Sequence, residues 1–515
     1  MGTRDATTRR SFLAVAGLAA AGLAVDAYAG HRPQRAVGRL VRTAGGLQER
    51  PRDGAREGSR PDSRPAAVRL LAAPATVDLG GRTASTWTFN GELPGPELRL
   101  RVGEVLRARL ENRLPAATTV HWHGIALDNR MDGVPGLTQS AVAPGQGFDY
   151  EFSVPDPGTY FYHPHVGLQI ERGLYGPLVV EDPGEVVHYD HEAVLILDDW
   201  TDAVGPSPEA ILANLQRGGM RHASQAGGMH HGHHGAGAAA TFDPTSPLGA
   251  DAGDVRHPLY LVNGRSPRSP TVLRGRPGER IRLRIVNTAA DTAFRLAVGG
   301  HRLKVTHADG FPIRPVTGDA LLIAMGERYD LQVELGDGVF PLVALAEGKD
   351  AQAFAVVRTS LGATPRANVR PAELDRWVVT VADLDAAGAV DLGRRPVSRT
   401  HRLVLDGNMA TYRWTINGHA HHGAAPLAAR QGERVRLVFE NRSAMFHPMH
   451  LHGHTFQVRR AGERRPGPRK DTIIVRPLER VTVEFDADNP GRWMLHCHNA
   501  YHQAGGMMTT LAYEP

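Results

Sequence analysis

A loose threefold repeat restricts the possible folds of this 515-residue chain more than any other feature of its sequence. The stretch NGELPGPELRLRVGEVLRARLENRL at 90–114 returns in altered form at 263–289 and again at 417–443. Each copy begins with Asn-Gly, turns at Gly-Glu and continues with alternating apolar and polar residues, the period of a half-buried strand. Because domains of about 150 residues are common, the repeat predicts an all-β chain of three consecutive sandwich or barrel domains.

The repeat and the composition around it place three domains at residues 66–184, 185–365 and 366–515. The outer two domains resemble each other most, because VPDPGTYFYH at 154–163 and ADNPGRWMLHC at 487–497 both combine a Pro-Gly turn, an aromatic strand and a His. The middle domain ends without a His pair, so we interpret it as a spacer. Its Met-, His- and Gly-rich insertion at 219–240 has the composition of a low-complexity loop.

The first 29 residues indicate an export signal. Arg9 and Arg10 precede an apolar run from Phe12 to Val25, which is followed by the small-residue cleavage pattern Ala-Tyr-Ala. This run is too short to span a bilayer comfortably, although a membrane anchor is the alternative. The Arg pair resembles a twin-arginine signal. We therefore expect a periplasmic, cell-surface or secreted protein, with no stable membrane span after signal cleavage.

The basic character of the chain is confined to this leader and to a linker at 30–65. The whole chain has a formal charge of +5, whereas residues 1–65 alone hold twelve Arg against six Asp or Glu. The remaining body is close to neutral, which argues against a nucleic-acid partner. The linker is rich in Arg, Gly and Pro and has no hydrophobic period, so we expect it to be disordered.

Four histidine clusters lie at equivalent ends of the two outer domains: HWHG at 121–124, HPH at 163–165, HPMHLHGH at 447–454 and HCHNAYHQAGGM at 496–507. Residues i and i+2 of a strand face the same side, so His-x-His presents two imidazoles together. Imidazoles suit Zn, Cu, Fe or Ni. Because the pairs come from both outer domains, we predict a metal cluster at the seam between them.

Cys497 is the only cysteine of the chain, so it cannot form an internal disulfide. His502 and Met507 follow it at intervals of five residues. Together with a His from another loop, they form the His₂Cys set with a weak axial Met that is typical of blue-copper centres. A buried inert thiol is the alternative. Met508 is the competing choice for the axial ligand, and we expect it to pack in the core instead.

With all four motifs in this order, residues 66–515 resemble the three-domain multicopper oxidases, the family of laccases, ascorbate oxidase and bacterial cuprous oxidases. The resemblance implies cupredoxin-like Greek-key β-sandwich domains and four copper ions per chain. It assigns the type 1 copper to His447, Cys497, His502 and Met507, the type 2 copper to His121 and His450, and the type 3 pair to His123, His163, His165, His452, His496 and His498.

The resemblance also implies an activity. Four one-electron oxidations of phenols, aromatic amines or Cu(I) at the type 1 copper would be coupled to reduction of O₂ to water at the trinuclear cluster. Electrons would enter through an exposed imidazole edge of His502 or His447. They would leave Cys497 by way of His496 or His498. We expect a monomer, with a role in copper tolerance as one possibility.

Reduction of O₂ also consumes protons, and in similar enzymes a carboxylate shortly after the first motif supplies them. Asp132 of RMDG occupies that place, although an Asp before Gly in a tight turn is the structural alternative. Several family members carry Glu directly after the second type 1 His, where this chain has Gln503. A neutral amide cannot donate and recover a proton as a carboxyl does, so water or another acid would have to replace it.

The insertion in the middle domain has two interpretations, a solvated loop or an accessory Cu(I) site built from Met220, Met229, His230, His231, His233 and His234. His419, His421 and His422 belong to a turn of the third repeat and are expected at the surface. A copper nitrite reductase would lack the His pairs at both ends. A copper-sequestering protein without activity, or a degenerate scaffold, is the other alternative, but a scaffold is expected to lose ligands and none is missing here.

Overall fold

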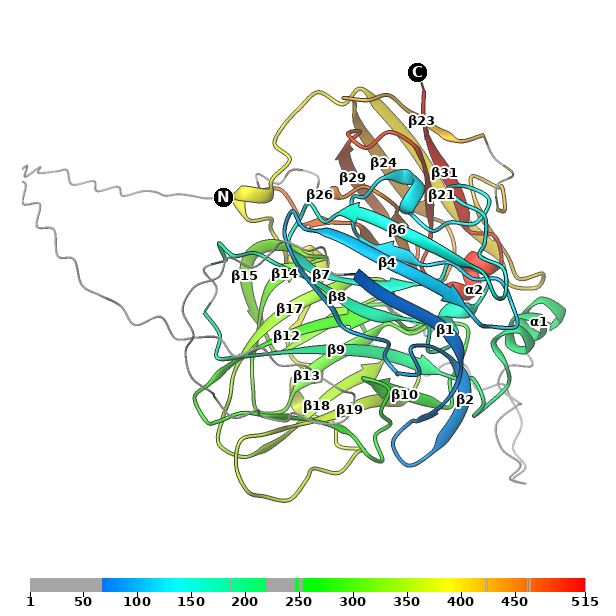
Figure 1. Cartoon of the computed structure of the whole chain (residues 1–515). Coiled ribbons are helices and arrows are strands. Elements are labelled where there is room, and N and C mark those ends of the chain that lie inside the picture. The colour runs from blue at the N-terminus through cyan, green and yellow to red at the C-terminus, as the bar shows by residue number, and fades with distance from the viewer. Residues whose placement is uncertain are drawn as a thin grey trace, which may run out of the picture. The chain divides into compact units, whose positions relative to one another are not determined.

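The computed structural model describes residues 67–185, 188–218, 246–249, 253–421, 423, 425–460, 462 and 465–514. These residues all belong to one compact unit, Arg42–Pro515. The predicted signal peptide at 1–29, the linker at 30–65 and the insertion at 219–240 lie outside the described residues. Six sheets of the described part form three cupredoxin-like sandwiches (Figure 1), which confirms the predicted all-β class.

The first sandwich consists of a sheet with the order β2-β1-β4-β6 and a sheet with the order β3-β8-β7-β5. Its elements are β1 (Ala67–Asp78), β2 (Thr83–Phe89), β3 (Leu98–Arg101), β4 (Val105–Asn112), β5 (His121–His123), η1 (Asn129–Met131), β6 (Gly147–Ser153), β7 (Gly158–His163), η2 (Gln169–Glu171) and β8 (Gly176–Glu181). In β4, Leu106 and Leu110 point into the core and Arg107 and Arg109 point to solvent. This is the alternation that the repeat predicts.

The second sandwich has two six-stranded sheets, β10-β9-β12-β17-β14-β15 and β11-β19-β18-β13-β16-β20. Its elements are β9 (His191–Trp200), α1 (Pro208–Gly218), β10 (Leu259–Val262), β11 (Thr271–Arg274), β12 (Arg280–Asn287), β13 (Phe294–Val298), β14 (Leu303–Ala308), β15 (Phe311–Gly318), β16 (Ala320–Ile323), β17 (Arg328–Glu334), β18 (Val339–Ala346), β19 (Ala351–Arg358), η5 (Ala372–Asp375) and β20 (Val378–Val379). β20 pairs with β16 although it follows the predicted boundary at 365.

The third sandwich contains the sheets β22-β21-β24-β29-β26-β27 and β23-β31-β30-β25-β28. Its elements are η6 (Val381–Asp383), η7 (Gly388–Val390), β21 (Arg399–Asn408), β22 (Arg413–Ile416), β23 (Leu427–Ala429), β24 (Arg434–Asn441), β25 (His447–Leu451), β26 (Phe456–Arg459), β27 (Arg469–Lys470), β28 (Thr472–Val475), β29 (Arg480–Asp486), β30 (Arg492–Cys497), α2 (Ala500–Ala504) and β31 (Met508–Tyr513). No helix in the described part of the chain is long and apolar enough to cross a membrane.

The sequence repeat corresponds to a repeat in strand pairing. Its alternating runs form β4, β12 and β24, each of which lies parallel to the first strand of its sandwich, β1, β9 or β21. On the other side each run pairs antiparallel with β6, β17 or β29. The three copies therefore occupy the same place in three similar sandwiches.

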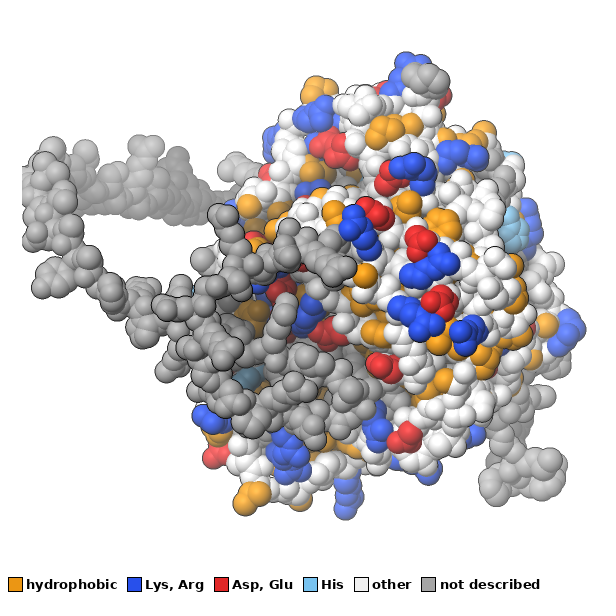
Figure 2. All heavy atoms as spheres, in the orientation of Figure 1, with side chains coloured by type: hydrophobic (Ala, Val, Ile, Leu, Met, Phe, Trp, Pro, Cys, Tyr) orange, Lys and Arg blue, Asp and Glu red, His pale blue; other side chains and the backbone are white. Residues whose placement is uncertain are grey.

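The solvent face of the first sandwich carries charges of both signs, as Figure 2 shows over β1, β4 and β6. Arg107 pairs with Glu151 at 3.0 Å and Arg109 with Asp149 at 2.6 Å, across β4 and β6. Exposed pairs of this kind contribute about 0–1 kcal/mol each. Their effect is a locally balanced surface rather than a basic patch.

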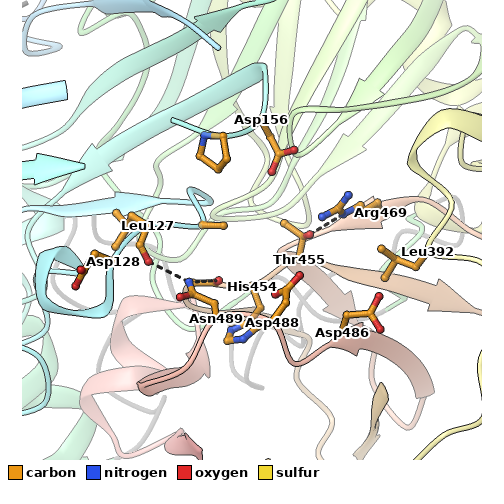
Figure 3. A pocket seen from close by; sticks show the side chains of 13 residues that line it. Leu127, Asp128, Asp156, Leu392, His454, Thr455, Arg469, Asp486, Asp488 and Asn489 are labelled. Atoms are coloured by element: carbon orange, nitrogen blue, oxygen red, sulfur yellow. Dashed lines mark hydrogen bonds between the residues drawn. The ribbon is translucent and has the colours of Figure 1, made fainter. Parts of the chain in front are cut away.

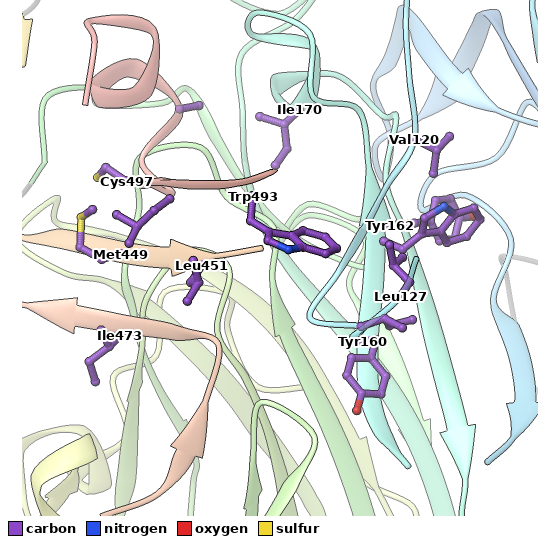
Figure 4. Packing of buried hydrophobic residues seen from close by; sticks show 14 of the residues in the cluster. Val120, Leu127, Tyr160, Tyr162, Ile170, Met449, Leu451, Ile473, Trp493 and Cys497 are labelled. Atoms are coloured by element: carbon purple, nitrogen blue, oxygen red, sulfur yellow. The ribbon is translucent and has the colours of Figure 1, made fainter. Parts of the chain in front are cut away.

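The first and third sandwiches share one continuous cluster of buried hydrophobic residues, whereas most buried hydrophobic residues of the second sandwich form a separate large cluster. Figure 4 shows Cys497, Leu451 and Trp493 of the third sandwich in the same cluster as Tyr162 and Ile170 of the first. Each fully buried large apolar side chain contributes about 1.5–3 kcal/mol. The shared core therefore fixes the strands of the two outer sandwiches, including those that carry the histidine clusters.

Candidate metal centres

The predicted copper ligands all lie in the described part of the chain and are all buried. Strand β5, the end of β7 and the turn after it supply the ligands of the first sandwich. Strands β25 and β30, helix α2 and the residues beside them supply those of the third. The set is His121, His123, His163, His165, His447, His450, His452, His496, Cys497, His498, His502 and Met507.

Three of these residues form a compact group, which we call the Cys497 site: Cys497, His447 and His502. The Nδ1 atoms of the two imidazoles lie 3.0 Å apart, and each lies 3.7 Å from the Cys497 Sγ. Two imidazole nitrogens and one thiolate that converge in this way match the His₂Cys set of a blue-copper site.

Local structure explains how His502 and Met507 reach the Cys497 site. The Asn499 side chain caps α2 by accepting hydrogen bonds from the backbone N–H groups of Tyr501 and His502. The Met507 carbonyl accepts the Cys497 N–H at 3.0 Å, and the Met507 side chain is fully buried. Met508 is only half-buried, so our expectation that it packs in the core was wrong. It opens β31 and pairs with His496.

Both imidazoles of the Cys497 site are covered on their outer nitrogens. His447 Nε2 lies 2.8 Å from Ser443 Oγ, and His502 Nε2 lies 2.9 Å from Asp254 Oδ2. The Trp414 ring packs against His502 with 4.1 Å between centroids. His447 is 0% and His502 1% exposed, so the predicted exposed imidazole edge is wrong. The segment of Asp254, just after the insertion, and the Trp414 side chain cover these rings.

Asp254 also determines the ring state of His502. Burial alone would lower the pKa of His502, but the adjacent carboxylate outweighs it and raises the pKa to about 10. The Tyr412 hydroxyl donates to the same Asp254 oxygen at 2.6 Å. Below that pKa the copper-free ring is an imidazolium. Its Nε2–H points to Asp254 and its Nδ1 faces Cys497, so Nδ1 is the nitrogen that must lose its proton when a metal binds.

The eight remaining imidazoles form a second group, which we call the eight-histidine centre. Its members come half from the first sandwich and half from the third. They cluster as His121, His123 and His450; His123, His163 and His498; and His165, His452 and His496. In the last trio the Nε2 of His496 lies 3.1 Å from that of His452 and 3.4 Å from that of His165.

The nitrogens of this centre fit a metal cluster. Buried polar atoms are normally hydrogen-bonded. Here the ring nitrogens without a partner are His121 Nε2, His123 Nδ1, His163 Nε2, His450 Nε2 and both nitrogens of His498. Burial and the neighbouring groups lower the pKa of His163 and His498 well below the usual value, which keeps their lone pairs free. Neutral imidazoles are the form that binds metals.

Asp471 is a component of this centre that sequence reasoning missed. Its Oδ1 lies 3.1 Å from His123 Nε2 and 3.3 Å from His450 Nδ1. Arg328 binds both Asp471 oxygens, at 2.7 and 2.6 Å. Burial opposes ionisation of Asp471, but Arg328 and His450 outweigh it and lower the pKa of the carboxyl. Because Arg328 belongs to the second sandwich, that sandwich is more than a spacer.

Asp132 lies on the outer side of the eight-histidine centre and is buried. Its carboxylate oxygens are 3.0 and 3.1 Å from His452 Nδ1, and one is 3.2 Å from His121 Nδ1. Its carbonyl also lies 2.8 Å from His121 Nδ1. Asp132 therefore touches the ring nitrogens opposite those that converge, which is the place of a residue that orients ligands.

Gln503 lies at the rim of a small cavity beside the eight-histidine centre. The cavity has a volume of about 10 Å³ and is lined in part by His163, His165 and His498. This volume is about what one water molecule needs. The cavity adjoins the centre at the position where the sequence lacks an acid.

A larger cavity of about 510 Å³ opens between the first and third sandwiches (Figure 3). Asn489 bridges its two sides by donating to the carbonyls of Leu127 and Gly453, both at 3.0 Å. Burial raises the pKa of Asp156 and Asp488 at its wall. The cavity is a polar space beside the loop that carries His452.

The remaining predicted histidines fall into two groups. His419 and His421 are exposed, as expected. His422 and the accessory set, Met220, Met229, His230, His231, His233 and His234, lie outside the described residues.

Three family models described as multicopper oxidase match this chain, at residues 72–185, 191–361 and 394–515. The chain is 48% identical over 460 residues to "Multicopper oxidase MmcO" of Mycobacterium tuberculosis, with 89% of each chain covered. It is 30% identical to "Copper resistance protein A homolog" of Pseudomonas syringae pv. tomato, over 85% of this chain and 90% of that protein.

A solved structure of a multicopper oxidase from Pseudomonas thermotolerans is similar in fold. The TM-score is 0.66 at 28% identity, with 88% of this chain and 100% of that chain covered. The matched models span all three sandwiches and include both candidate centres. The chain therefore belongs to the multicopper oxidase family and is a copper-dependent oxidoreductase that passes electrons from a reducing substrate to O₂.

Proposed function

We propose that the Cys497 site holds a type 1 copper, with Met507 as its weak fourth ligand, and that the eight-histidine centre holds three more. His121 and His450 would bind the type 2 ion. The type 3 pair would be bound by His123, His163, His165, His452, His496 and His498. The observation that carries this proposal is the convergence of buried ligand atoms: Cys497 Sγ with two Nδ1 atoms at one site, and ring nitrogens without a hydrogen-bond partner at the eight-histidine centre.

When bound, the coppers would supply the redox chemistry, in which four one-electron oxidations are coupled to reduction of O₂ to water. The chain contributes connection and orientation. Cys497 is the last residue of strand β30 and lies between His496 and His498 in the chain, so a few covalent bonds join the two centres. Asp254 holds the proton of His502 on the outer nitrogen, which directs the inner nitrogen toward Cys497.

Asp132 is the proposed source of protons for O₂ reduction. Its burial and its contacts with His452 and His121 support a role at this centre. Gln503 can orient a water molecule through its amide but cannot store a proton. Water in the small cavity beside Gln503 would therefore replace the missing acid on that side.

Cu(I) is the proposed physiological substrate, with phenols or aromatic amines as the alternative. Both imidazoles of the Cys497 site are buried, so an aromatic donor cannot contact a ring edge. Asp254 Oδ1 is buried without a hydrogen-bond partner and lies on the same carboxylate that contacts His502, which suits a small cation. The similarity to copper resistance proteins supports a role in copper tolerance.

Oxygen consumption with Cu(I) and with a panel of phenols tests this choice. Cu(I) should be oxidised faster, and Asp254→Asn should slow Cu(I) oxidation more than phenol oxidation. Faster oxidation of phenols, unaffected by the substitution, would favour a laccase-like enzyme. Metal analysis should find four coppers per chain, and the optical spectrum should show an intense blue band. A colourless protein, or one copper per chain, would contradict the proposed centres.

Export and copper collection are proposed for the segments outside the described residues. Lys in place of Arg9 and Arg10 should retain the protein in the cytoplasm if the twin-arginine signal is used, as cell fractionation would show. Deletion of 219–235 should reduce Cu(I) oxidation more than phenol oxidation. Equal losses on both substrates would reject an accessory Cu(I) site.

A further inference from the structure

Asp291 is a buried carboxylate of the second sandwich that joins it to the Cys497 site. Its Oδ1 accepts hydrogen bonds from Asn499 Nδ2 at 2.6 Å and from the Asp254 N–H at 3.2 Å. Its Oδ2 accepts from the Val255 N–H and from Lys349 Nζ, both at 2.8 Å. One side chain therefore connects the segment that contains Asp254 with the residue that caps α2.

The first connection ends at the backbone of His502. The Asn499 Oδ1 that caps α2 accepts from the His502 N–H at 3.1 Å, while the Asn499 Nδ2 is held by Asp291. The Ala500 N–H donates to the Ala290 carbonyl at 2.8 Å. The loop of Ala290 and Asp291 thus fixes the start of the helix that carries His502.

The second connection ends at the imidazole of His502. The Asp254 N–H is held by Asp291, and the Asp254 carboxylate lies 2.9 Å from His502 Nε2. Gly253 permits this approach because it adopts φ +74°, and a Cβ there would lie 2.6 Å from the Asp291 Oδ2. The backbone and the ring of His502 are consequently tied to the same carboxylate.

We propose that Asp291 is a positioning residue for His502, through which the second sandwich sets the geometry and the reduction potential of the type 1 copper. The inference about the potential rests on the proposed function, since it requires copper at the Cys497 site. The positioning of α2 and of the Asp254 segment does not require copper and is testable without it. Partners that orient a metal ligand commonly tune the metal that it binds.

A role in stability alone is the competing explanation. Lys349 is buried and paired with Asp291, and removing one partner of a buried ion pair is strongly destabilising. The test therefore needs a variant that spares this pair and a control that loses an equivalent carboxylate elsewhere. Asn499→Ser keeps a side chain that can cap α2 and removes the donor to Asp291. Asp330→Asn removes a buried carboxylate that binds Arg282 in the same sandwich.

Amide hydrogen exchange in the copper-free full chain is the first measurement. Exchange at residues 500–504 should be about tenfold faster in Asp291→Asn, because hydrogen bonds to a charged group are lost. Asn499→Ser should accelerate the same amides, and Asp330→Asn should not. Unchanged exchange in Asn499→Ser would overturn the proposal, even if Asp291→Asn failed to fold.

The second measurement is the reduction potential of the type 1 copper in the copper-loaded protein, followed through its blue absorption band. It should shift in Asp291→Asn and Asn499→Ser, and it should stay constant in Asp330→Asn at a comparable loss of thermal stability. Equal potentials in all variants would reduce Asp291 to a structural role. A wild-type protein without a blue band would instead refute the proposed copper site, and the exchange experiment would still decide the positioning of α2.

Discussion

The two candidate centres share strand β30 but differ in what surrounds their ligands. At the Cys497 site the outer nitrogens contact the neutral hydroxyl of Ser443 and the single carboxylate of Asp254, and Trp414 packs on the rings. At the eight-histidine centre, the carboxylates of Asp132 and Asp471 each contact two imidazoles. The centre with two carboxylates suits a reaction that consumes protons, and the site with a single carboxylate and a packed indole suits electron transfer.

The largest expected effect separates the two centres outright. Cys497→Ser removes the thiolate, so it should abolish the blue band and substrate oxidation. The eight-histidine centre should keep its copper, because none of its ligands changes. Metal analysis and optical spectra of the purified variant provide the measurement. Met508→Leu is the matched control on the neighbouring strand and should keep the blue band. Loss of all copper in Cys497→Ser would show that the centres do not form independently.

Asp471→Asn should damage the other centre selectively. Loss of this charge removes the closer ion-pair partner of the buried Arg328 and leaves Asp309 at 3.6 Å. Breaking a buried pair costs about 3–5 kcal/mol, and the substitution also weakens the orientation of His123 and His450. Metal affinity or activity is expected to fall by about 10- to 100-fold. Copper titration should show the loss at the eight-histidine centre while the blue band persists. A weaker blue band with an intact eight-histidine centre would show that Asp471 supports the Cys497 site instead.

The pH dependence of the copper-free protein examines the carboxylate of the Cys497 site. The pKa of His502 is about 10 in the folded chain, against about 6.5 for an unperturbed His. A raised pKa means that the pair with Asp254 stabilises the fold fully below pH of about 6.5 and that this contribution disappears as the pH rises through about 10. The thermal unfolding midpoint of the wild type should fall as the pH rises across this range.

The matched variant for this experiment is Asp254→Asn, which should have a lower midpoint at about pH 6 and little further loss on the way to about pH 10. The difference between the two proteins therefore isolates the pair from other titrating groups. Parallel curves for the two proteins would contradict the assigned role of Asp254.

The smallest expected effect comes from the neutral partner of the Cys497 site. Ser443→Ala removes the hydroxyl that contacts His447 Nε2 and should lower the free energy of unfolding by about 0.5–1.5 kcal/mol. Denaturant titration measures this loss, and the blue band should persist. A loss as large as that of Asp471→Asn would remove the distinction between a neutral and a charged surrounding.

The clustering of the candidate ligands was predictable from the sequence because His-x-His spacing is local. A strand places alternate residues on one face, so a pair such as His121 and His123 can be recognised from the sequence without knowledge of the fold. The repeat likewise predicted three similar sandwiches, because each alternating run forms the same strand in each. Local periodicity was sufficient for both inferences.

The residues that orient the ligands could not be found in this way. Asp471, Arg328, Asp254 and Asp291 stand in four separate segments and form no motif. Only the tertiary fold brings Arg328 to Asp471 or Asp254 to His502. The expected open edge of His502 failed for the same reason, since the covering carboxylate is 248 positions away along the chain.

The division of the eight imidazoles between the two outer sandwiches has a consequence for biosynthesis. His121 and its neighbours are synthesised long before β30, because 375 residues separate His121 from His496 (496 − 121). At translation rates of about 5–20 residues per second, the intervening chain takes roughly 20–75 s to appear. During most of that interval the nascent chain contains only four of the eight histidines of the centre. A transcript truncated shortly before β30 yields a protein that retains most of its mass but lacks part of both candidate metal centres.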